Sequence, residues 1–599
     1  MTMSLFVSLA LATASPAAMP AAQALRARLP EDETIYFLLP DRFENGDPKN
    51  DKGGLKGDRL KTGYDPTHKG FFHGGDLKGL TARLDYIQKL GATAIWLAPI
   101  FKNKPVQGAP GQETAAYHGY WVTDFTTVDP HFGTEADFKA LVDAAHARGM
   151  KVYMDILINH TADVIQYREC PASSCAYRSR ADYPYSRRQR DGAAINAGFA
   201  GDAVQTAENF AKLTDTDYAY QVFVPPAEAK VKVPAWLNDT KFYHNRGDST
   251  FTGESSTMGD FSGLDDVMTE DPRVIDGFID IYASWIDRFG IDGYRIDTAK
   301  HVNSEFWTKF TPAILERAKA RGIPNFHVFG EVALGELDVQ TLARFTREAG
   351  LPAVLDFAFR RAAIDAVSGK TGTDRLNYLF EGDSLYEGGA AAALRLPTFL
   401  GNHDLGRFAR EMRLANPHAD DAEILRRVRL GHALMFVSRG VPTLYSGDEQ
   451  GFAGDGVDQD AREDMFPSKV AIYNDNDLVG TDATTAVSNF DETHPLYREI
   501  AALAALRTAH AALRRGRQII RNYSDKPGLF ALSRVDAQSG EEVLAVFNTS
   551  TQPLTAHVEV DPRHTNFTAL RGTCPVAPKA PGQLAISLAP LDYMICRAK

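Results

Sequence analysis

The sequence predicts an α/β fold in which eight parallel strands alternate with helices and close into a (β/α)8 TIM barrel. Three observations predict this fold. Short apolar runs alternate with amphipathic helical stretches over most of the 599 residues. Eight such runs occur, and eight is the number of strands in a closed βα barrel. Polar residues gather directly after the runs, where such barrels place their functional groups.

Each element has a local reason in the sequence. Apolar residues at helical spacing predict helices over Glu135–Arg148, Val274–Phe289 and Ala422–Val437. Pro272 fits the first turn of the second helix, because a residue there needs no backbone N–H donor. The expected strands are short and mostly apolar: Ile35–Leu39, Ala94–Ala98, Val152–Leu157, Gly293–Asp297, Val328–Glu331, Ala353–Phe357, Leu396–Leu400 and Thr443–Tyr445.

Two regions depart from this alternation. Residues 161–265 follow the third strand, are rich in Tyr, Asp, Arg and Pro, and show little periodicity, which predicts an inserted subdomain. Residues 517–599 alternate short strands with turns, which predicts a C-terminal antiparallel β-sandwich. The barrel then comprises residues 25–160 and 266–516.

The chain is acidic, with a formal net charge of −12. Nucleic acid binding needs basic surface, so the charge argues against a polyanionic partner and fits a neutral or cationic ligand better. A monomer is expected.

The N-terminus predicts a signal peptide over residues 1–24 and therefore a periplasmic or secreted protein. The apolar run Leu5–Ala14 is too short to span a bilayer, and Ala22-Gln23-Ala24 offers a small-residue cleavage site. No Lys or Arg lies between Met1 and Leu5, so a misassigned start or a frayed terminus is the alternative. No other stretch predicts a membrane span.

The four cysteines agree with export. Cys170 and Cys175 form one local pair and Cys574 and Cys596 another, which predicts two disulfides in an oxidising compartment. Zinc binding is the weaker alternative because neither pair has Cys-x-x-Cys spacing, and free buried cysteines are a further alternative.

Charged and polar side chains follow four of the expected strands. Because the carboxyl ends of barrel strands meet at one face, these side chains are expected to converge. The segments are DILINH with Asp155, Asn159 and His160; GYRIDTAKH with Arg295, Asp297, Lys300 and His301; FGEV with Glu331; and FLGNHD with Asn402, His403 and Asp404.

Three acids in this arrangement suit cleavage of a glycosidic bond, which needs one protonated carboxyl and one carboxylate. Arg295, two residues before Asp297 on one strand face, is expected to hold Asp297 ionised as the nucleophile. Glu331 lies between apolar residues, so desolvation is expected to raise its pKa and to make it the general acid and base. Asp404 is the third carboxylate. A separation of about 5–5.5 Å between Asp297 and Glu331, and retention of configuration, are expected.

These segments resemble the conserved regions of the α-amylase family of glycoside hydrolases (family 13). YHGYWVTDF at 117–125, LDDVMTEDPRV at 264–274 and GVPTLYSGDEQG at 440–451 extend the resemblance over roughly residues 33–515. Alone, a strand-end His, a Tyr in an apolar run or an Arg–Asp pair is usually structural; their joint order favours function. The resemblance implies Asp297, Glu331 and Asp404 as catalytic residues, and Tyr120, His160, Arg295, Lys300, His301 and His403 as sugar-binding residues.

The resemblance also implies calcium as a cofactor. Asn159, Asp266 and the backbone of His301 resemble the family's site between the insert and the barrel, and Asp266 is placed there by the DPRV that follows it. DRFENGDPKND at 41–51 resembles the calcium loop of cyclodextrin glucanotransferases, with a solvated turn as the alternative. The matching residues of this loop are Asn45, Asp47, Asn50 and Asp51, with Gly74 and Asp76 from the later HGGD.

The expected function is cleavage of α-1,4-glucosidic bonds in starch, maltodextrin or related α-glucans through a covalent glycosyl-enzyme intermediate. Cyclodextrin glucanotransferase, cyclomaltodextrinase and α-glucosidase activities are alternatives, and a non-catalytic glucan-binding role is a remote one. Glucanotransferases normally carry two further β domains and a large aromatic residue at the end of the insert. The alignment places Ser262 at that position, next to Phe261. Gly401 stands where α-amylases often have an acidic residue.

Overall fold

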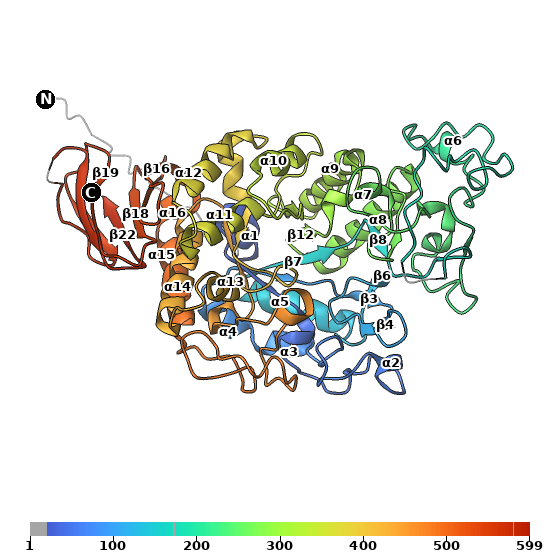
Figure 1. Cartoon of the computed structure of the whole chain (residues 1–599), viewed down its shortest axis with the longest axis horizontal. Helices are drawn as coiled ribbons and strands as arrows, with labels where there is room; N and C mark the ends of the chain where they lie inside the picture. The colour runs from blue at the N-terminus through green and yellow to red at the C-terminus, as the bar shows by residue number, and fades with distance from the viewer. Residues whose placement is uncertain (1–20, 172–173, 579, 599) are drawn as a thin grey trace, which may run out of the picture.

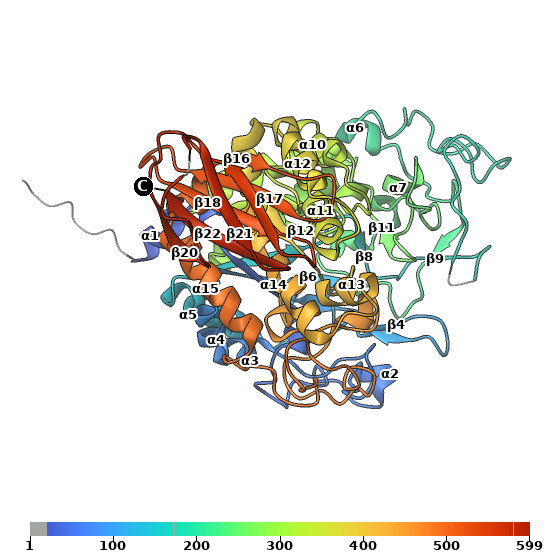
Figure 2. The ribbon, with the colours of Figure 1, turned by 60° about the vertical axis from the view of Figure 1, so that its left-hand side comes forward.

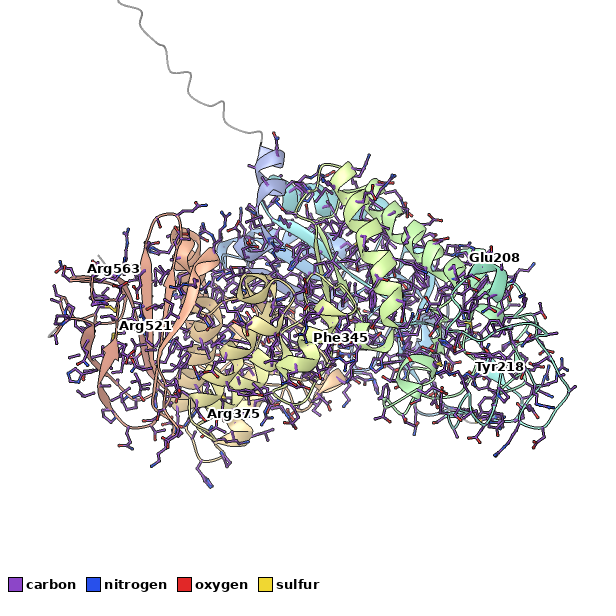
Figure 3. The ribbon with its side chains drawn as sticks, turned by 90° about the horizontal axis from the view of Figure 1, so that it is seen from above. Glu208, Tyr218, Phe345, Arg375, Arg521 and Arg563 are labelled. Carbon is purple, nitrogen blue, oxygen red and sulfur yellow. A yellow bond between two sulfur atoms is a disulfide. The ribbon has the colours of Figure 1, made fainter. Side chains whose placement is uncertain are left out.

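The computed structural model describes residues 21–171, 174–578 and 580–598. Three parts follow one another along the long axis of the molecule, with the barrel in the middle (Figure 1). The insert, which carries Glu208 and Tyr218, lies at one end, and the C-terminal domain, which carries Arg521 and Arg563, lies at the other (Figure 3). The first 20 residues, which include most of the expected signal peptide, lie outside the described residues.

Seven parallel strands form the barrel sheet in the order β13-β12-β7-β2-β1-β15-β14. The first and last strands in sequence are neighbours, since Ile35 of β1 pairs with Thr443 of β15. Every residue of these strands is buried, as expected for a parallel sheet covered by helices. The strands are β1 (Ile35–Leu38), β2 (Ala94–Leu97), β7 (Lys151–Ile156), β12 (Gly293–Ile296), β13 (His327–Gly330), β14 (Pro397–Phe399) and β15 (Val441–Tyr445).

The sixth expected strand, Ala353–Phe357, is reduced to a single parallel bridge between Gly330 and Val354. The segment still occupies the sixth place, because Leu355 N–H donates to the Gly330 carbonyl and Asp356 N–H donates to the Pro397 carbonyl. Its regular run is cut short because Asp356 caps helix α11, which begins at Phe357. The barrel is therefore closed by a strand too short to be regular.

The barrel helices begin and end where the sequence supplies caps. Thr134 and Asp137 form a capping box at the start of α5, and Asp271 caps α8 with Pro272 in its first turn. The larger barrel helices are α3 (Leu77–Ala82), α4 (Leu84–Lys89), α5 (Glu135–Ala147), α8 (Pro272–Phe289), α9 (Ser304–Ala320), α10 (Val339–Arg347), α11 (Phe357–Ser368), α12 (Asp374–Glu381), α13 (Phe408–Ala415), α14 (Asp421–Val437), α15 (Pro495–Ala509) and α16 (Ala511–Arg515). Helix α1 (Ala21–Ala27) precedes the barrel.

The two ends of the insert are tied together at the barrel. Strands β8 (His160–Thr161) and β11 (Asp265–Asp266) pair antiparallel, with Asp266 opposite His160. Regular elements are few between them, as the sequence predicts: β9 (Gln166–Tyr167), α6 (Ala207–Phe210), β10 (Val222–Phe223) and α7 (Ser255–Met258). The β8–β11 pair thus fixes His160 and Asp266 at the barrel mouth. Between β2 and α5 the chain forms β3 (Phe101–Asn103), β4 (Val106–Gln107), β5 (Thr114–Ala115) and β6 (Val122–Val128).

The C-terminal domain is a sandwich of two antiparallel sheets (Figure 2). One sheet has the order β16-β17-β18-β22-β20, and β19 pairs with β21 in the other. A separate apolar core that includes Val546, Val558 and Ile586 lies between them. The strands are β16 (Arg517–Asn522), β17 (Leu529–Val535), β18 (Glu542–Asn548), β19 (Leu554–Glu559), β20 (Phe567–Arg571), β21 (Gln583–Leu588) and β22 (Asp592–Ala598).

Both expected cysteine pairs are disulfides. Cys170–Cys175 closes a short loop of the insert, and Cys574–Cys596 ties β22 to the segment before β21; each pair has a Cα–Cα distance of 5.9 Å. A search of the described residues finds no helix with the length and apolar content that a membrane span needs.

Candidate active site

The carboxyl ends of the barrel strands bring the expected acids into one cleft of about 1120 Å³. Asp297, Glu331 and Asp404 all line it, and they follow β12, β13 and β14 directly or within a few residues. Strand register adds Asp155, which pairs with Arg295 across β7 and β12. The convergence expected from the sequence is therefore present.

Arg295 is the hub of this cluster and is completely buried. Its Nη1 donates to both oxygens of Asp155 at 2.8 and 2.9 Å and to Asp297 Oδ1 at 2.7 Å. Its Nη2 lies 2.9 Å from Glu331 Oε1. One guanidinium therefore faces three buried carboxyl groups, so the acids around Arg295 outnumber the cation.

That charge balance sets the acidity of the carboxyl groups. Burial raises the pKa of Glu331 to about 7, and the nearby Asp297 and Asp404 add to the rise while Arg295 opposes it. Sequence spacing gave Glu331 no cation, but the fold places Arg295 against it. Burial also raises the pKa of Asp297 and outweighs the lowering effect of Arg295. The expected Arg295–Asp297 contact is present, but it does not by itself control Asp297.

Asp404 is more open than the other two acids, with 44% of its side chain exposed. Arg462 holds it: Nη2 donates to Asp404 Oδ1 at 3.1 Å, and Nε donates to the His403 carbonyl at 3.0 Å. Asp458, from the same segment as Arg462, also pairs with that guanidinium. The sequence did not single out Asp458 or Arg462, because they lie in an irregular segment after β15 that has no periodic signal.

Tyr120 lines the cleft, and His403 is buried against it without lining the cleft itself. Their rings stack with centroids 5.5 Å apart, and the Tyr120 hydroxyl lies 2.9 Å from His403 Nε2. Gly119, the residue before Tyr120, lets the chain pass close to Pro99: its φ is +88°, and a Cβ there would lie 2.0 Å from the Pro99 carbonyl oxygen. Burial lowers the pKa of His403 well below its ordinary value, so the ring is neutral.

The other expected sugar contacts surround the same cleft. His160 lines it, and burial lowers its pKa to about 3. Lys300 donates to the Ala333 carbonyl at 3.2 Å, and His301 Nδ1 lies 2.8 Å from the Ser256 carbonyl. Both line the cleft. Phe261 stacks on His160, so the end of the insert does present an aromatic ring there, one residue before the aligned Ser262.

The expected calcium loop has oxygen atoms without partners. Asn45 Oδ1 and Asn50 Oδ1 are buried and accept no hydrogen bond among the described residues. Gly74, with φ +100°, leaves room beside them, because a Cβ there would lie 2.8 Å from Asp51 Oδ1. Two unpaired amide oxygens beside the carboxylate of Asp51 fit a hard cation such as Ca²⁺.

The remaining two acids of the loop are partly committed. Asp76 accepts hydrogen bonds from the backbone of Gly46, Asp47 and Gly79, and from Asn50 Nδ2. Asp47 pairs with Lys78 at 2.6 Å. Asp76 therefore shapes the loop whether or not a cation is bound, and the open oxygens belong to the asparagines.

The second expected calcium site lies at the junction of the insert and the barrel. Asn159 and Asp266 are brought together in the β8–β11 region, since Val267 N–H donates to the Asn159 carbonyl. His301 contacts Ser256 and Phe261 of the insert. Asp266 Oδ2 lies 2.6 Å from His244 Nδ1, and His244 Nε2 lies 3.0 Å from Glu270 Oε2. One oxygen of Asp266 is thus already engaged by this chain.

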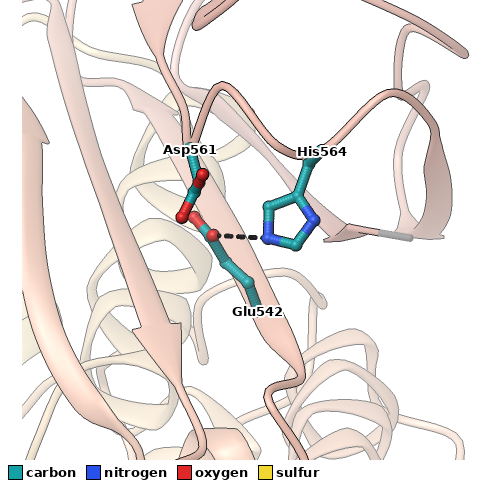
Figure 4. Close-up of side chains that lie close together, drawn as sticks. All are labelled: Glu542, Asp561 and His564. Atoms are coloured by element: carbon teal, nitrogen blue, oxygen red, sulfur yellow. Dashed lines mark ion pairs between the residues drawn. The ribbon is translucent and has the colours of Figure 1, made fainter.

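A separate group of ligand-type side chains lies in the C-terminal domain: Glu542, Asp561 and His564 (Figure 4). His564 Nε2 lies 3.0 Å from Glu542 Oε2, and Arg521 binds Glu542 Oε1 at 2.7 Å. Arg563 binds both oxygens of Asp561. Each acid thus has its own arginine, and ion pairing accounts for the group.

A (β/α)8 barrel whose strand ends join three carboxylates around one arginine in an open cleft is the arrangement of a glycoside hydrolase barrel. Comparison with known proteins agrees. The family model "Alpha amylase, catalytic domain" matches residues 37–522. The chain belongs to the α-amylase family.

Relatives and solved structures extend this result. An α-amylase of Streptomyces lividans is 47% identical over 525 residues, which cover 88% of this chain and 56% of that protein. A cyclomaltodextrin glucanotransferase of Niallia circulans is 31% identical, covering 74% of this chain and 52% of that one. The chain thus spans little more than half the length of these two relatives.

Two solved structures cover nearly the whole chain. An Anoxybacillus α-amylase has a TM-score of 0.68 at 27% identity and covers 95% of this chain and 98% of that one. CldA, described as a cyclomaltodextrin glucanotransferase with a three-domain ABC distribution, has a TM-score of 0.69 at 26% identity and covers 94% and 99%. A three-domain chain therefore does not by itself separate an α-amylase from a glucanotransferase.

Proposed function

We propose that this protein is a retaining glycoside hydrolase that cleaves α-1,4-glucosidic bonds of starch, maltodextrin or related α-glucans. One observation carries the proposal: Asp297, Glu331 and Asp404 line one cleft, and Arg295 contacts the first two. The neutral polysaccharide is compatible with the acidic chain, because it brings no charge of its own into a site with excess negative charge.

Two steps follow from the geometry. Glu331 gives its proton to the glycosidic oxygen as the bond from that oxygen to the anomeric carbon breaks, and Asp297 forms an ester bond to the same carbon. Glu331, now a carboxylate, then takes a proton from water, whose oxygen attacks the anomeric carbon and releases Asp297. Asp404 supports the positive charge that develops on the sugar in both steps.

The surrounding residues bind the sugar at the cleavage point. Tyr120 offers a ring on which a sugar face can stack, and His160 and His403 are neutral rings beside it. Lys300 and His301 lie toward the insert, on the side of the leaving group. The predicted separation of about 5–5.5 Å between Asp297 and Glu331 stays a prediction of the retaining mechanism.

Transfer to another sugar is the second candidate function. Phe261 presents an aromatic ring at the end of the insert, and proteins named cyclomaltodextrin glucanotransferases are similar to most of this chain. An aromatic ring there can hold an acceptor sugar and exclude water. Hydrolysis remains the main proposal because the α-amylase of Streptomyces lividans is the more similar of the two relatives.

A product profile on soluble starch, cyclodextrin and maltotriose tests both candidates. A rapid loss of starch viscosity with linear maltooligosaccharide products is the expected result. Cyclic products from starch support the glucanotransferase candidate, and glucose alone from maltotriose supports an α-glucosidase. No release of reducing sugar from any of the three would refute the hydrolase proposal.

Calcium is the proposed cofactor, and repeating the profile with a chelator tests it. Asn45, Asn50, Asp51 and the Gly74 region are the group with the strongest support, because two of their oxygens are buried without partners. The ion would supply a fixed positive charge that joins the loop to the segment around Gly74. Asn159, Asp266 and the His301 backbone complete the proposed ligand set.

The domain limits, the export and the oligomeric state of the protein are proposed as follows. Residues 161–265 are proposed as the insert and 517–599 as the C-terminal domain. Export to the periplasm or the medium is proposed from the N-terminal segment, and two disulfides support it. A relative in Escherichia coli carries the name periplasmic α-amylase. A monomer is proposed.

A further inference from the structure

Asp155 contacts Arg295 and the cleft residue Tyr120 and has no role in the steps above. Its side chain is completely buried. Three donors converge on its Oδ2: Arg295 Nη1 at 2.9 Å, Trp96 Nε1 at 3.2 Å and the Tyr120 hydroxyl at 3.1 Å. A carboxyl oxygen that faces three donors carries no proton, because that proton would point at the hydrogens of the donors. Burial raises the pKa of Asp155 to about 8, but the three donors confine any proton to Oδ1, so Oδ2 accepts in either state.

The acceptor state of Asp155 decides what Tyr120 does with its single proton. The Tyr120 hydroxyl donates to Asp155, so toward His403 only its oxygen lone pair remains. His403 Nε2 lies 2.9 Å from that oxygen. Nε2 must then carry the hydrogen and donate it to Tyr120, which fixes the tautomer of the neutral imidazole.

A second contact requires the same tautomer. His403 Nε2 also lies 3.4 Å from Asp404 Oδ2, so an unprotonated Nε2 would direct its lone pair at a carboxylate. His403 Nδ1 is buried and has no hydrogen-bond partner among the described residues, so no acceptor holds a hydrogen at that end of the ring. The Nε2–H group thus faces both Tyr120 and the third carboxylate of the cleft.

We propose that Asp155 is a positioning residue that sets the His403 tautomer through the Tyr120 hydroxyl, and thereby holds the ring and Asp404 in place for the cleavage step. The inference rests on the proposed hydrolase function. Asp155 therefore does more than pair with Arg295, because two consecutive hydrogen bonds link its carboxyl group through the Tyr120 hydroxyl to His403 Nε2.

A double-mutant cycle between Asp155→Ala and Tyr120→Phe tests this chain. Asp155→Ala removes the acceptor of the Tyr120 hydroxyl, so Tyr120 would donate to His403 Nε2 and shift the hydrogen of the ring to Nδ1. Tyr120→Phe keeps the ring and removes the hydroxyl that links the two residues. On a chromogenic maltoheptaoside, each single change is expected to lower kcat at least tenfold with KM within threefold. Asp155→Ala is expected to cost at least threefold less in the Tyr120→Phe background than in the wild type.

The matched control is Tyr153→Phe. Tyr153 lies on the same strand as Asp155, is completely buried, and its hydroxyl has no partner among the described residues. Removing that hydroxyl is expected to leave kcat and KM unchanged. Circular dichroism and thermal unfolding of every variant check that the fold is intact.

Nitrogen NMR of histidine-labelled protein gives a readout that does not depend on activity. The wild type is expected to show His403 hydrogenated at Nε2 and Asp155→Ala at Nδ1, with His403→Gln used to assign the signal. Equal tautomers in both proteins, or multiplicative losses in the cycle, overturn the inference. If Asp155→Ala does not fold, an unchanged kcat in Tyr120→Phe alone overturns it. A wild type without glucan hydrolysis instead defeats the proposed function, and the tautomer assignment is then judged by NMR.

Discussion

Two groups of carboxylates and histidines in this protein contrast sharply in their charge balance. In the barrel, Asp155, Asp297 and Glu331 face a single guanidinium, that of Arg295. In the C-terminal domain, Glu542 and Asp561 each have an arginine of their own. Both groups are dense in ionisable side chains, but only the barrel group leaves its negative charge uncompensated.

The pKa values follow the same contrast. Burial beside like charges raises the pKa of Glu331 to about 7, whereas the hydrogen bonds from Arg563 lower the pKa of Asp561. A raised pKa keeps a proton available near neutral pH, which acid catalysis needs. A lowered pKa, as for Asp561, keeps the carboxylate ionised near neutral pH and leaves no proton to donate. Buried acids in a cleft that outnumber their cations thus indicate a catalytic site, whereas acids that each have an arginine indicate structural ion pairs.

The largest expected effect is on activity. Glu331→Gln and Asp297→Asn are each expected to lower kcat by at least about 1000-fold, because each removes a group that makes or breaks a bond. Glu542→Gln, the same change in the C-terminal group, is expected to leave kcat within twofold. Initial rates on maltoheptaose measure all three. Comparable losses in the two groups would erase the contrast.

The next largest effect is on stability and concerns the two arginines. Arg295→Met leaves three buried carboxylates without a cation, and the expected loss is about 3–5 kcal/mol in the free energy of unfolding. Arg563→Ala removes a side chain that is 86% exposed, and no measurable loss is expected. Urea unfolding of both variants provides the measurement, and an equal loss in the two would contradict the contrast.

The pH dependence should have opposite signs in the two groups. Because the folded protein raises the pKa of Glu331 from 4.5 to about 7, the contribution of Glu331 to stability is complete below pH 4.5 and is lost as the pH rises through 7. Glu331→Gln is therefore expected to gain up to about 3 kcal/mol relative to the wild type at pH 8 compared with pH 4. Asp561, whose pKa is lowered, stabilises above its ordinary pKa and loses that contribution as the pH falls.

Activity gives a second readout of the same pKa. The kcat/KM of the wild type is expected to fall above about pH 7, as free Glu331 loses its proton. The same alkaline limb is expected in Asp561→Asn, and a wild type without a limb near pH 7 would assign the acid to another residue.

The smallest expected effect concerns the loop at 41–51, which is a third kind of site. It has partnerless oxygens and too few cations, so a bound cation should complete it. EGTA is expected to lower the Tm of the wild type by a few degrees, and the addition of calcium is expected to restore it. Asp51→Ala should abolish the response to calcium, whereas Asp58→Asn, at the exposed cap of a short helix, should keep it. A wild type whose Tm ignores both additions contradicts the calcium proposal at this loop.

Much of the fold could be predicted from the sequence, because the barrel strands are continuous apolar runs. Seven expected strands appear within a few residues of their predicted limits. The remaining one, the sixth strand at Ala353–Phe357, reduces to one bridge because Asp356 serves as a helix cap, and a strand pattern of five residues cannot reveal that competition.

The site was predictable where it follows a strand. The sequence located Asp297, Glu331 and Asp404, and the fold brings all three to one cleft. It named Asp155 at a strand end but gave it no role, because the contact with Tyr120 joins residues 35 positions apart. Arg462 was not predicted, because its contact with Asp404 depends on how an irregular segment folds back over the cleft. The spacing of residues along the chain does not indicate such a fold.

The closure of the barrel has a consequence for how the protein is made. Ile35 cannot meet Thr443 until roughly 400 further residues have been synthesised, which takes tens of seconds at about 5–20 residues per second. During that interval the edge of β1 that will bind β15 is exposed as an unpaired, fully apolar template. Protection of that edge in the nascent chain, rather than the speed of any local step, is expected to limit the yield of folded protein.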